Sequence, residues 1–214
     1  MMLLSHPTGN QNVRNAALAF HRSGLLERFY TTVVWRDSGL ARLLPGSVLA
    51  TLRRRRYEML PDERVSTYPV LEACRLLAVG LKLNALTRHE TGPCCVDAVY
   101  RTLDAHVARE LRGMTSVSGV YTYEDGALQT LRAAKQKGMR TTYEVASAHW
   151  RAAARIFKEE AELNPEWATT IAALRDSPEK LERKDEEIRL ADQVVVASKF
   201  TASSLGLGEF DDKK

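Results

Sequence analysis

The feature that most constrains the fold of this chain is a strand–helix–strand pattern over residues 117–145. It opens with a short apolar run, residues 117–123, rich in the β-branched and aromatic side chains that are typical of a buried strand. Apolar residues then recur at helical spacing over residues 127–134, and Gly138 follows as a helix C-cap. Residues 139–145 are strand-like again. A helix between two parallel strands makes a right-handed crossover, so this segment predicts part of a parallel sheet.

The first strand of this unit ends in two adjacent carboxylates, Glu124 and Asp125. In open parallel sheets ligands collect at the carboxyl ends of strands, so these side chains are the first candidates for chemistry. Asp125 also has a structural alternative, because it stands where the N-cap of a helix from Gly126 is expected. Glu124 is therefore the clearer candidate for ligand contact.

Strand-like and helical segments alternate along the whole chain, and this alternation predicts an α/β fold. We expect a doubly wound, mostly parallel, Rossmann-like sheet flanked by helices over residues 1–205, with residues 206–214 beginning a linker. Further strands are predicted over residues 1–5, 29–35, 64–68 and 192–197. Further helices are predicted over residues 13–22, 40–44, 70–86, 97–111, 150–161, 167–174, 177–190 and 200–205.

Composition excludes several classes of protein. The hydrophobic fraction of 44% and the charged fraction of 27% are ordinary for a soluble globular chain. No apolar run reaches the roughly 20 residues that a membrane-spanning helix needs, and the opening run is too short for a signal peptide. Three cysteines, two of them adjacent at Cys94 and Cys95, give neither a disulfide framework nor metal-ligand spacing. We expect a cytoplasmic protein without a metal site.

A run of four arginines, Arg53, Arg54, Arg55 and Arg56, supplies most of the mild basic bias, a net charge of +4. The run is either a solvated helix face or a contact surface for an anionic membrane or another polyanion. If it contacts a membrane, the protein would be peripheral at the inner face of that membrane. Nucleic acid is not an expected partner, because no binding motif or second basic cluster is present. We interpret the apolar helix over residues 70–86 as a core helix, the alternative being a helix on a membrane surface.

The loop after the first strand, residues 6–12, carries Pro and Gly, with Asn12 as the expected helix N-cap. A strand, a Gly-containing turn and a helix can place backbone N–H groups against a phosphate, which makes Gly9 and Asn10 candidates for that contact. An ordinary turn is the alternative, since one Gly is not a Gly-rich fingerprint. His6 follows the strand end directly and is a candidate for substrate contact.

The loop after the strand over residues 139–145 carries His149 and Trp150. Because this strand end shares a rim with Glu124, we consider His149 as a catalytic or substrate-binding residue and Trp150 as a substrate contact. The structural alternative for His149 is a residue that starts the next helix. The remaining histidines, at positions 21, 89 and 106, belong to no constellation and are interpreted as structural or surface residues.

Several short motifs recur in a specific order and spacing, and together they resemble a known family. They are YEDGAL at 123–128, YE at 143–144, HW at 149–150, IFKEEA at 156–161, NPEW at 164–167, DSPEKL at 176–181, KDEE at 184–187, and AD at 191–192 followed by VVVAS at 194–198. In this order they resemble the amino-terminal domain of a family 4 glycosyltransferase, which has the two-domain GT-B architecture. The resemblance covers nearly the whole chain.

The resemblance implies transfer of a sugar from a nucleotide-sugar, used as a substrate with no separate cofactor, to an acceptor hydroxyl. The amino-terminal domain would hold the acceptor, a glycan, lipid or small molecule. A carboxy-terminal domain beyond Lys214, absent here with its paired glutamates, would hold the donor, so this chain alone is expected to be inactive. The resemblance places the donor phosphates near Gly9 and Asn10. It places the acceptor beside Glu124 and Asp125, where a carboxylate would orient or deprotonate its hydroxyl.

A function of a different class fits the same sequence, a non-catalytic α/β binding module that docks on a partner or an anionic membrane through the arginine run. A complete small enzyme with catalysis at Glu124 and His149 is a weaker alternative, because no nucleophile motif or dinucleotide Gly pattern accompanies them. The coding sequence downstream of Lys214 would separate these hypotheses. A second α/β domain there favours the transferase, and a stop codon without a partner gene favours the module.

Overall fold

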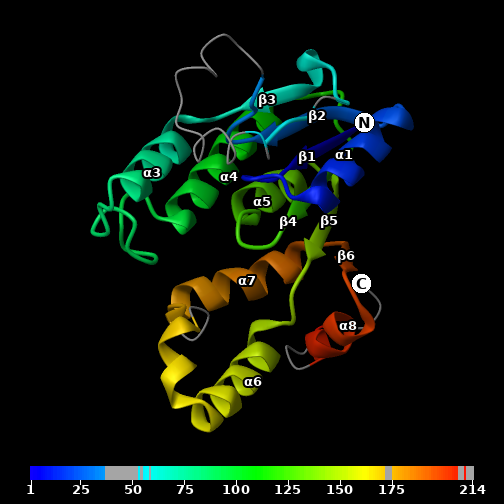
Figure 1. The fold of residues 1–214 in the computed structure, drawn as a ribbon. Helices are drawn as coiled ribbons and strands as arrows, with labels where there is room; N and C mark the ends of the chain where they lie inside the picture. The colour runs from blue at the N-terminus through cyan, green and yellow to red at the C-terminus, as the bar shows by residue number, and fades with distance from the viewer. Residues whose placement is uncertain (37–52, 54, 58, 172–174, 207–209, 211–214) are drawn as a thin grey trace.

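The computed structural model describes residues 1–36, 53, 55–57, 59–171, 175–206 and 210 (Figure 1). Its centre is a six-stranded sheet with the order β3-β2-β1-β4-β5-β6, and every neighbouring pair of strands is parallel. Helices flank this sheet, so the predicted doubly wound, Rossmann-like α/β fold is confirmed. The strands are β1 (Met2–Ser5), β2 (Leu26–Thr31), β3 (Val65–Thr67), β4 (Gly119–Tyr123), β5 (Arg140–Val145) and β6 (Gln193–Val196).

The helices connect successive strands, as parallel pairing requires. The α-helices are α1 (Gln11–Arg22), α3 (Val70–Gly80), α4 (Val96–Gly113), α5 (Leu128–Gln136), α6 (Trp150–Leu163), α7 (Pro178–Leu190) and α8 (Lys199–Leu205), and the 3₁₀ helices are η2 (Asp62–Arg64) and η3 (Pro165–Thr170). Among the described residues no helix is both long and apolar enough to cross a lipid bilayer.

The core has two parts, one on each face of the sheet. Successive residues of a strand point to opposite faces, and in β1 Leu3 packs into one part while Leu4 packs into the other. The larger part lies between the sheet and helices α4, α5 and α7. The smaller part is closed by α1 and by Tyr57 and Leu60. The segment over residues 117–145 thus forms β4, α5 and β5 at the centre of the fold (Figure 1).

Two predicted boundaries near the amino terminus differ from the structure. Helix α1 starts at Gln11, because its N-cap is Asn10, whose Oδ1 accepts the Val13 N–H at 3.0 Å. The prediction of Asn12 as N-cap was wrong. Strand β2 covers Leu26–Thr31 instead of residues 29–35. The chain leaves the ladder at Thr32, whose N–H and hydroxyl both donate to the Pro7 carbonyl. The helix predicted over residues 40–44 lies outside the described residues. The helix predicted over residues 167–174 corresponds to the 3₁₀ helix η3, Pro165–Thr170, and residues 172–174 lie outside the described residues.

The interpretation of residues 70–86 as a core helix was wrong. Helix α3 ends at Gly80, and its buried residues are Glu72 and Ala78, not its large apolar side chains. Glu72 is 1% exposed and forms ion pairs with Arg55 and Arg75. A buried carboxylate must have such partners. This pairing therefore orients α3 with Glu72 and the small Ala78 towards the protein interior. Leu77 of α3, with Leu81, Leu83 and Leu86 after it, is exposed, whereas Leu71 and Leu76 are half-buried.

Candidate functional site

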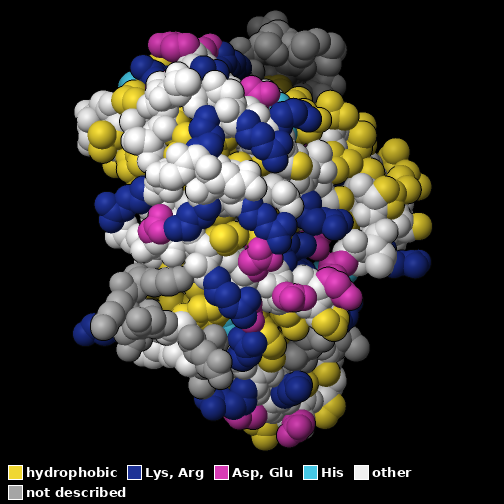
Figure 2. Space-filling model, turned by 180° about the vertical axis from the view of Figure 1, so that it is seen from behind, with side chains coloured by type: hydrophobic (Ala, Val, Ile, Leu, Met, Phe, Trp, Pro, Cys, Tyr) yellow, Lys and Arg dark blue, Asp and Glu magenta, His cyan; other side chains and the backbone are white. Residues whose placement is uncertain are grey.

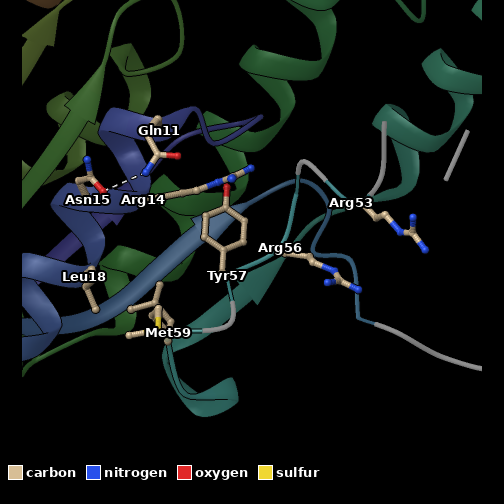
Figure 3. Close-up of a pocket in the computed structure, with 9 residues that line it drawn as sticks. Gln11, Arg14, Asn15, Leu18, Arg53, Arg56, Tyr57 and Met59 are labelled. Atoms are coloured by element: carbon tan, nitrogen blue, oxygen red, sulfur yellow. Dashed lines mark hydrogen bonds between the residues drawn. The ribbon is translucent and has the colours of Figure 1, made fainter. Parts of the chain in front are cut away.

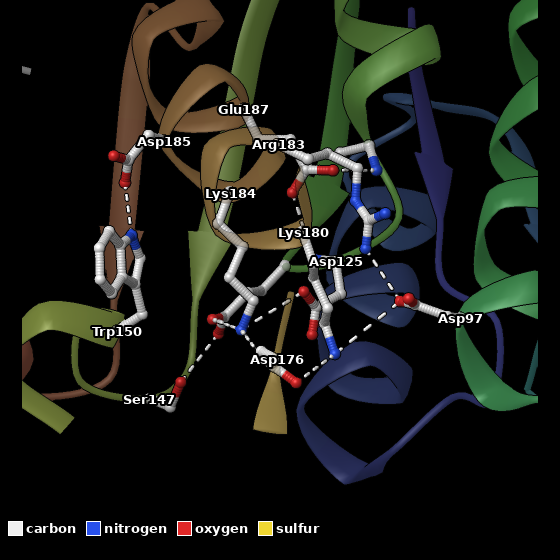
Figure 4. Close-up of polar contacts among 12 residues, drawn as sticks. Asp97, Asp125, Ser147, Trp150, Asp176, Lys180, Arg183, Lys184, Asp185 and Glu187 are labelled. Atoms are coloured by element: carbon white, nitrogen blue, oxygen red, sulfur yellow. Dashed lines mark hydrogen bonds and ion pairs between the residues drawn. The ribbon is translucent and has the colours of Figure 1, made fainter. Parts of the chain in front are cut away.

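The strand order reverses between β1 and β4, and in open α/β sheets this reversal creates a crevice at the carboxyl ends of the strands. His6 follows β1, Glu124 and Asp125 follow β4, and Ser147 and His149 follow β5. Figure 4 shows that side chains from the amino-terminal half of α7 reach over this edge of the sheet. The candidate site is therefore built by three strand ends and one helix.

Lys184 of α7 holds the two predicted carboxylates together. Its Nζ lies 3.4 Å from Glu124 Oε1 and 3.4 Å from Asp125 Oδ1, and the Ser147 hydroxyl donates to Glu124 Oε2 at 2.9 Å (Figure 4). Burial raises the pKa of Glu124, with Lys184 opposing this shift. Burial lowers the pKa of Lys184, but the carboxylates of Asp125 and Glu124 outweigh it and the net shift is upward. The arrangement is a carboxylate pair with one shared cation.

A pocket of about 720 Å³ opens beside Asp125. Its wall combines carboxylates, cations and a phenol. They come from α4 and the segment before it, from the β4–α5 turn, and from the start of α7 and the segment before that helix, and they include His89, Asp97, Tyr100, Asp125, Arg175 and Lys180. The wall offers both donors and acceptors, which suits a ligand with many hydroxyl groups better than an apolar one. His89 was interpreted from sequence as a structural or surface residue, and the structure places it in this wall.

Ion pairs fix the polar side chains of the wall in position. Lys180 Nζ lies 3.1 Å from Asp176 Oδ1 and 3.8 Å from Asp97 Oδ1, and Arg183 donates to Asp97 Oδ1 at 2.9 Å (Figure 4). The side chains of Lys180, Asp97 and Asp176 are at most 11% exposed. Since these groups are already oriented, a ligand would meet them without first ordering them.

His89, Glu90 and Asp176 bring ligand atoms within 4.8 Å of one another, close enough to hold a cation. Their carboxylates already have protein partners, because Lys180 pairs with Asp176 and the Ser177 N–H donates to Glu90 Oε1 at 2.9 Å. A divalent cation would have to displace the Lys180 ammonium from this cluster. The geometry therefore favours a hydrogen-bonding role for these residues.

The amino end of α5 is capped by a buried carboxylate from α7. Glu187, 0% exposed, accepts the Ala127 and Leu128 N–H groups on Oε1 at 3.0 and 3.1 Å, and the Asp125 N–H on Oε2 at 3.2 Å. The Tyr143 hydroxyl also donates to Oε2 at 2.6 Å. Burial raises the pKa of Glu187 to about 7, against the opposing effect of these bonds.

A second carboxylate, from α4, completes this cap. Asp104 accepts the Gln129 and Thr130 N–H groups at 2.7 and 2.9 Å. The alternative role of Asp125 as N-cap was therefore wrong, since the N-cap position is Ala127 and the capping carboxylates come from other helices. Asp125 instead adopts φ +73°, which directs its carboxylate to Lys184 and the pocket.

His149 is buried and has a structural role. It is 2% exposed, its Nδ1 accepts the Arg151 N–H as the N-cap of α6, and its Nε2 lies 3.0 Å from Asp185 Oδ1. The indole N–H of Trp150 donates to the same oxygen at 2.7 Å. Burial lowers the pKa of His149, which favours the neutral ring. The helix-start alternative is confirmed, and the geometry gives no support to a catalytic His149.

The first loop is organised around His6. Its Nδ1 accepts the Thr8 and Gly9 N–H groups at 3.1 and 2.8 Å, so these donors point at the imidazole instead of at a ligand. Burial, with a smaller contribution from Arg55, lowers the pKa of His6 to about 4. Gly9 adopts φ +63°, and Asn10 caps α1. These contacts explain Gly9 and Asn10 as the ordinary turn and cap considered above, and they leave the predicted phosphate contact unsupported.

His6 makes stability depend on pH. Its pKa is lower in the folded state, so the protein loses stability as pH falls from about 6.5 towards 4, by up to about 3 kcal/mol. Asn at this position keeps an acceptor oxygen for the loop without titrating. We expect urea unfolding to show that His6→Asn is less sensitive to acid than the wild type in this window. Equal acid sensitivity of the two proteins would contradict this role of His6.

The arginine run is divided by the fold. Arg55 is 6% exposed in its pair with Glu72, which rules it out as a polyanion contact, and Arg54 lies outside the described residues. Arg53 and Arg56 line a second pocket, of about 400 Å³, together with Arg14 of α1 (Figure 3). Sequence reasoning did not identify Arg14, because it lies 39 positions before Arg53 in the chain.

Comparison with known proteins adds no assignment. No family model matches the chain, and neither a curated protein nor a solved structure matches it. The sheet topology itself classifies the chain as a Rossmann-like α/β fold with a six-stranded parallel sheet.

Proposed function

We propose that this chain is the acceptor-side domain of a glycosyltransferase and that the pocket beside Asp125 binds the acceptor sugar or alcohol. The observation that supports this proposal is the position and lining of the pocket. It lies at the carboxyl edge of a parallel sheet, and its wall offers carboxylates, ammonium and guanidinium groups, and a phenol to a polyhydroxylated ligand. The ordered motifs that resemble family 4 point to the same function.

In this proposal the carboxylate pair orients the acceptor. Asp125 lines the pocket and accepts a hydrogen bond from an acceptor hydroxyl, while its ion pair with Lys184 holds the carboxylate in position. Glu124 is 20% exposed and shares the Lys184 ammonium with Asp125, and burial raises the pKa of its carboxyl group. A nucleotide-sugar would be held by a second domain facing this edge. The chain alone then binds acceptor but does not turn over.

Calorimetry tests this division of labour. We expect residues 1–214 to bind simple methyl glycosides or oligosaccharides weakly, and UDP- and GDP-sugars no more tightly than the sugars alone. Asp125→Asn should weaken saccharide binding about tenfold or more, because it removes a charged acceptor. Glu162→Gln, an exposed site on α6, is the matched control and should change nothing. Tight binding of a nucleotide-sugar by this chain alone would contradict the proposal.

A further inference from the structure

Helix α3 and the segment that follows it expose an unusual number of large apolar side chains. Of the twelve such side chains found exposed among the described residues, six lie between positions 70 and 86. Val70, Leu77 and Leu81 are 68%, 66% and 69% exposed. In Figure 2 hydrophobic side chains gather along the edge of the molecule that α3 forms. We call the surface made by Val70, Leu77, Leu81, Leu83 and Leu86 the α3 face; Val79, two residues from Leu77, lies on another side of the helix.

The α3 face has the pattern of an amphipathic helix whose apolar side contacts another apolar surface. Val70, Ala73, Cys74, Leu77 and Leu81 are exposed and recur at intervals of three and four residues, which makes one stripe along the helix. Glu72 and Ala78, which lie off this stripe, are the buried residues of α3. A soluble monomer normally leaves large apolar side chains scattered singly over its surface, so a continuous stripe marks a contact surface.

The exposed charged side chains within the stretch that carries the α3 face are basic. Over residues 70–88 the exposed charged side chains are Lys82 and Arg88. Glu72 provides the carboxylate of this stretch, and it is 1% exposed and neutralised by Arg55 and Arg75. An apolar stripe with basic residues at its end and no exposed carboxylate complements an anionic lipid surface, where leucines enter the interface and basic side chains meet the head groups.

We propose that the α3 face docks this protein on the surface of an anionic membrane. The charge pattern favours an anionic lipid surface over a second copy of the chain, because head groups supply the negative charge for Lys82 and Arg88, whereas residues 70–88 of a second copy offer no exposed carboxylate. The surface differs from the arginine run considered above, since Arg55 is buried and Arg53 and Arg56 line another pocket.

Docking through the α3 face would also place the polar pocket near the membrane. The segment that carries Leu83 and Leu86 contributes Asn84, Ala85 and Arg88 to the pocket wall. The mouth of the pocket and the apolar stripe are therefore formed by one continuous stretch of chain. The docking proposal itself rests only on the α3 face, so it stands or fails independently of the proposed sugar-binding function.

Vesicle sedimentation tests the proposal. We expect residues 1–214 to bind vesicles of phosphatidylcholine mixed with phosphatidylglycerol, and to bind phosphatidylcholine alone much more weakly. The double variant Leu77→Gln, Leu81→Gln should lower the partition coefficient on mixed vesicles about tenfold or more, because the polar amides no longer favour the interface. Lys82→Glu with Arg88→Glu should remove the preference for anionic vesicles. Both pairs of positions are exposed, so circular dichroism should show an unchanged fold.

The matched control is Leu163→Gln, at a leucine that is 75% exposed at the end of α6, outside the α3 face, and it should bind like the wild type. Absence of binding to mixed vesicles would overturn the proposal, and so would binding that the Leu77 and Leu81 changes leave intact. If light scattering instead shows dimers that the double variant dissociates, with no vesicle binding, the occupant of the α3 face is a second copy.

Discussion

Replacing Glu187 by alanine is expected to lower the free energy of unfolding by about 3–5 kcal/mol. The carboxylate is 0% exposed and accepts the N–H groups of Asp125, Ala127 and Leu128 as well as the Tyr143 hydroxyl. Its removal leaves these donors buried without an acceptor, at the point where β4 turns into α5. Urea denaturation followed by circular dichroism measures this loss.

The neighbouring Glu186 provides the control. It is 32% exposed and pairs with Arg132 on the surface, so Glu186→Ala should cost less than about 1 kcal/mol. The two changes remove the same chemical group from consecutive positions of α7, and only one of them empties the cap of α5. Similar losses for both variants would show that the amino end of α5 does not depend on Glu187.

The second large effect is expected for Gly9→Ala, with a loss of about 2–4 kcal/mol. Gly9 has φ +63°, a conformation that side chains other than glycine rarely adopt. A methyl group there would overlap the Tyr57 hydroxyl and lie 2.5 Å from Tyr57 Cζ. Tyr57 is 8% exposed in the smaller part of the core, so it has little room to move away. Urea denaturation again gives the measurement.

Gly24→Ala separates the two causes of this effect. Gly24 has a similar φ of +68°, but nothing lies within 4 Å of a Cβ added there. In this variant the free energy of unfolding should fall by only about 1 kcal/mol, the cost of placing alanine at a positive φ. A loss at Gly9 no larger than the loss at Gly24 would contradict the close packing of Tyr57 on the first loop.

The fold was predictable because its information is local and repeats along the chain. The apolar runs of β4 and β5, with the helical period of α5 between them, were sufficient to predict a parallel sheet. Positions where tertiary contacts override local preference were not predictable. Strand β2 stops at Thr31 because Thr32 bonds Pro7, although the sequence that follows has high strand propensity. Helix α3 buries Glu72, which pairs with Arg55, and leaves Leu77 exposed.

The sequence predicted where the candidate site lies, but not all of the residues that form it. Glu124 and Asp125 were identified by their position after a strand, and they do face the crevice edge. Lys184 was not identified, because nothing in the sequence shows that α7 crosses this edge. Burial and hydrogen bonding also distinguish structural residues from residues that can contact a ligand, which residue type alone cannot do. His6 and His149 hold backbone groups inside the protein, whereas Asp125 lines the pocket.

The most direct test of the proposed acceptor site is an amide chemical-shift titration of residues 1–214 with the saccharides used for calorimetry. The account predicts shifts that saturate together at Asp97, Tyr100, Asp125 and Lys180, around the polar pocket, with none at the first loop. It would be contradicted by shifts confined to Thr8 and Gly9 or to the pocket at Arg14, or by no saturable shift with any saccharide.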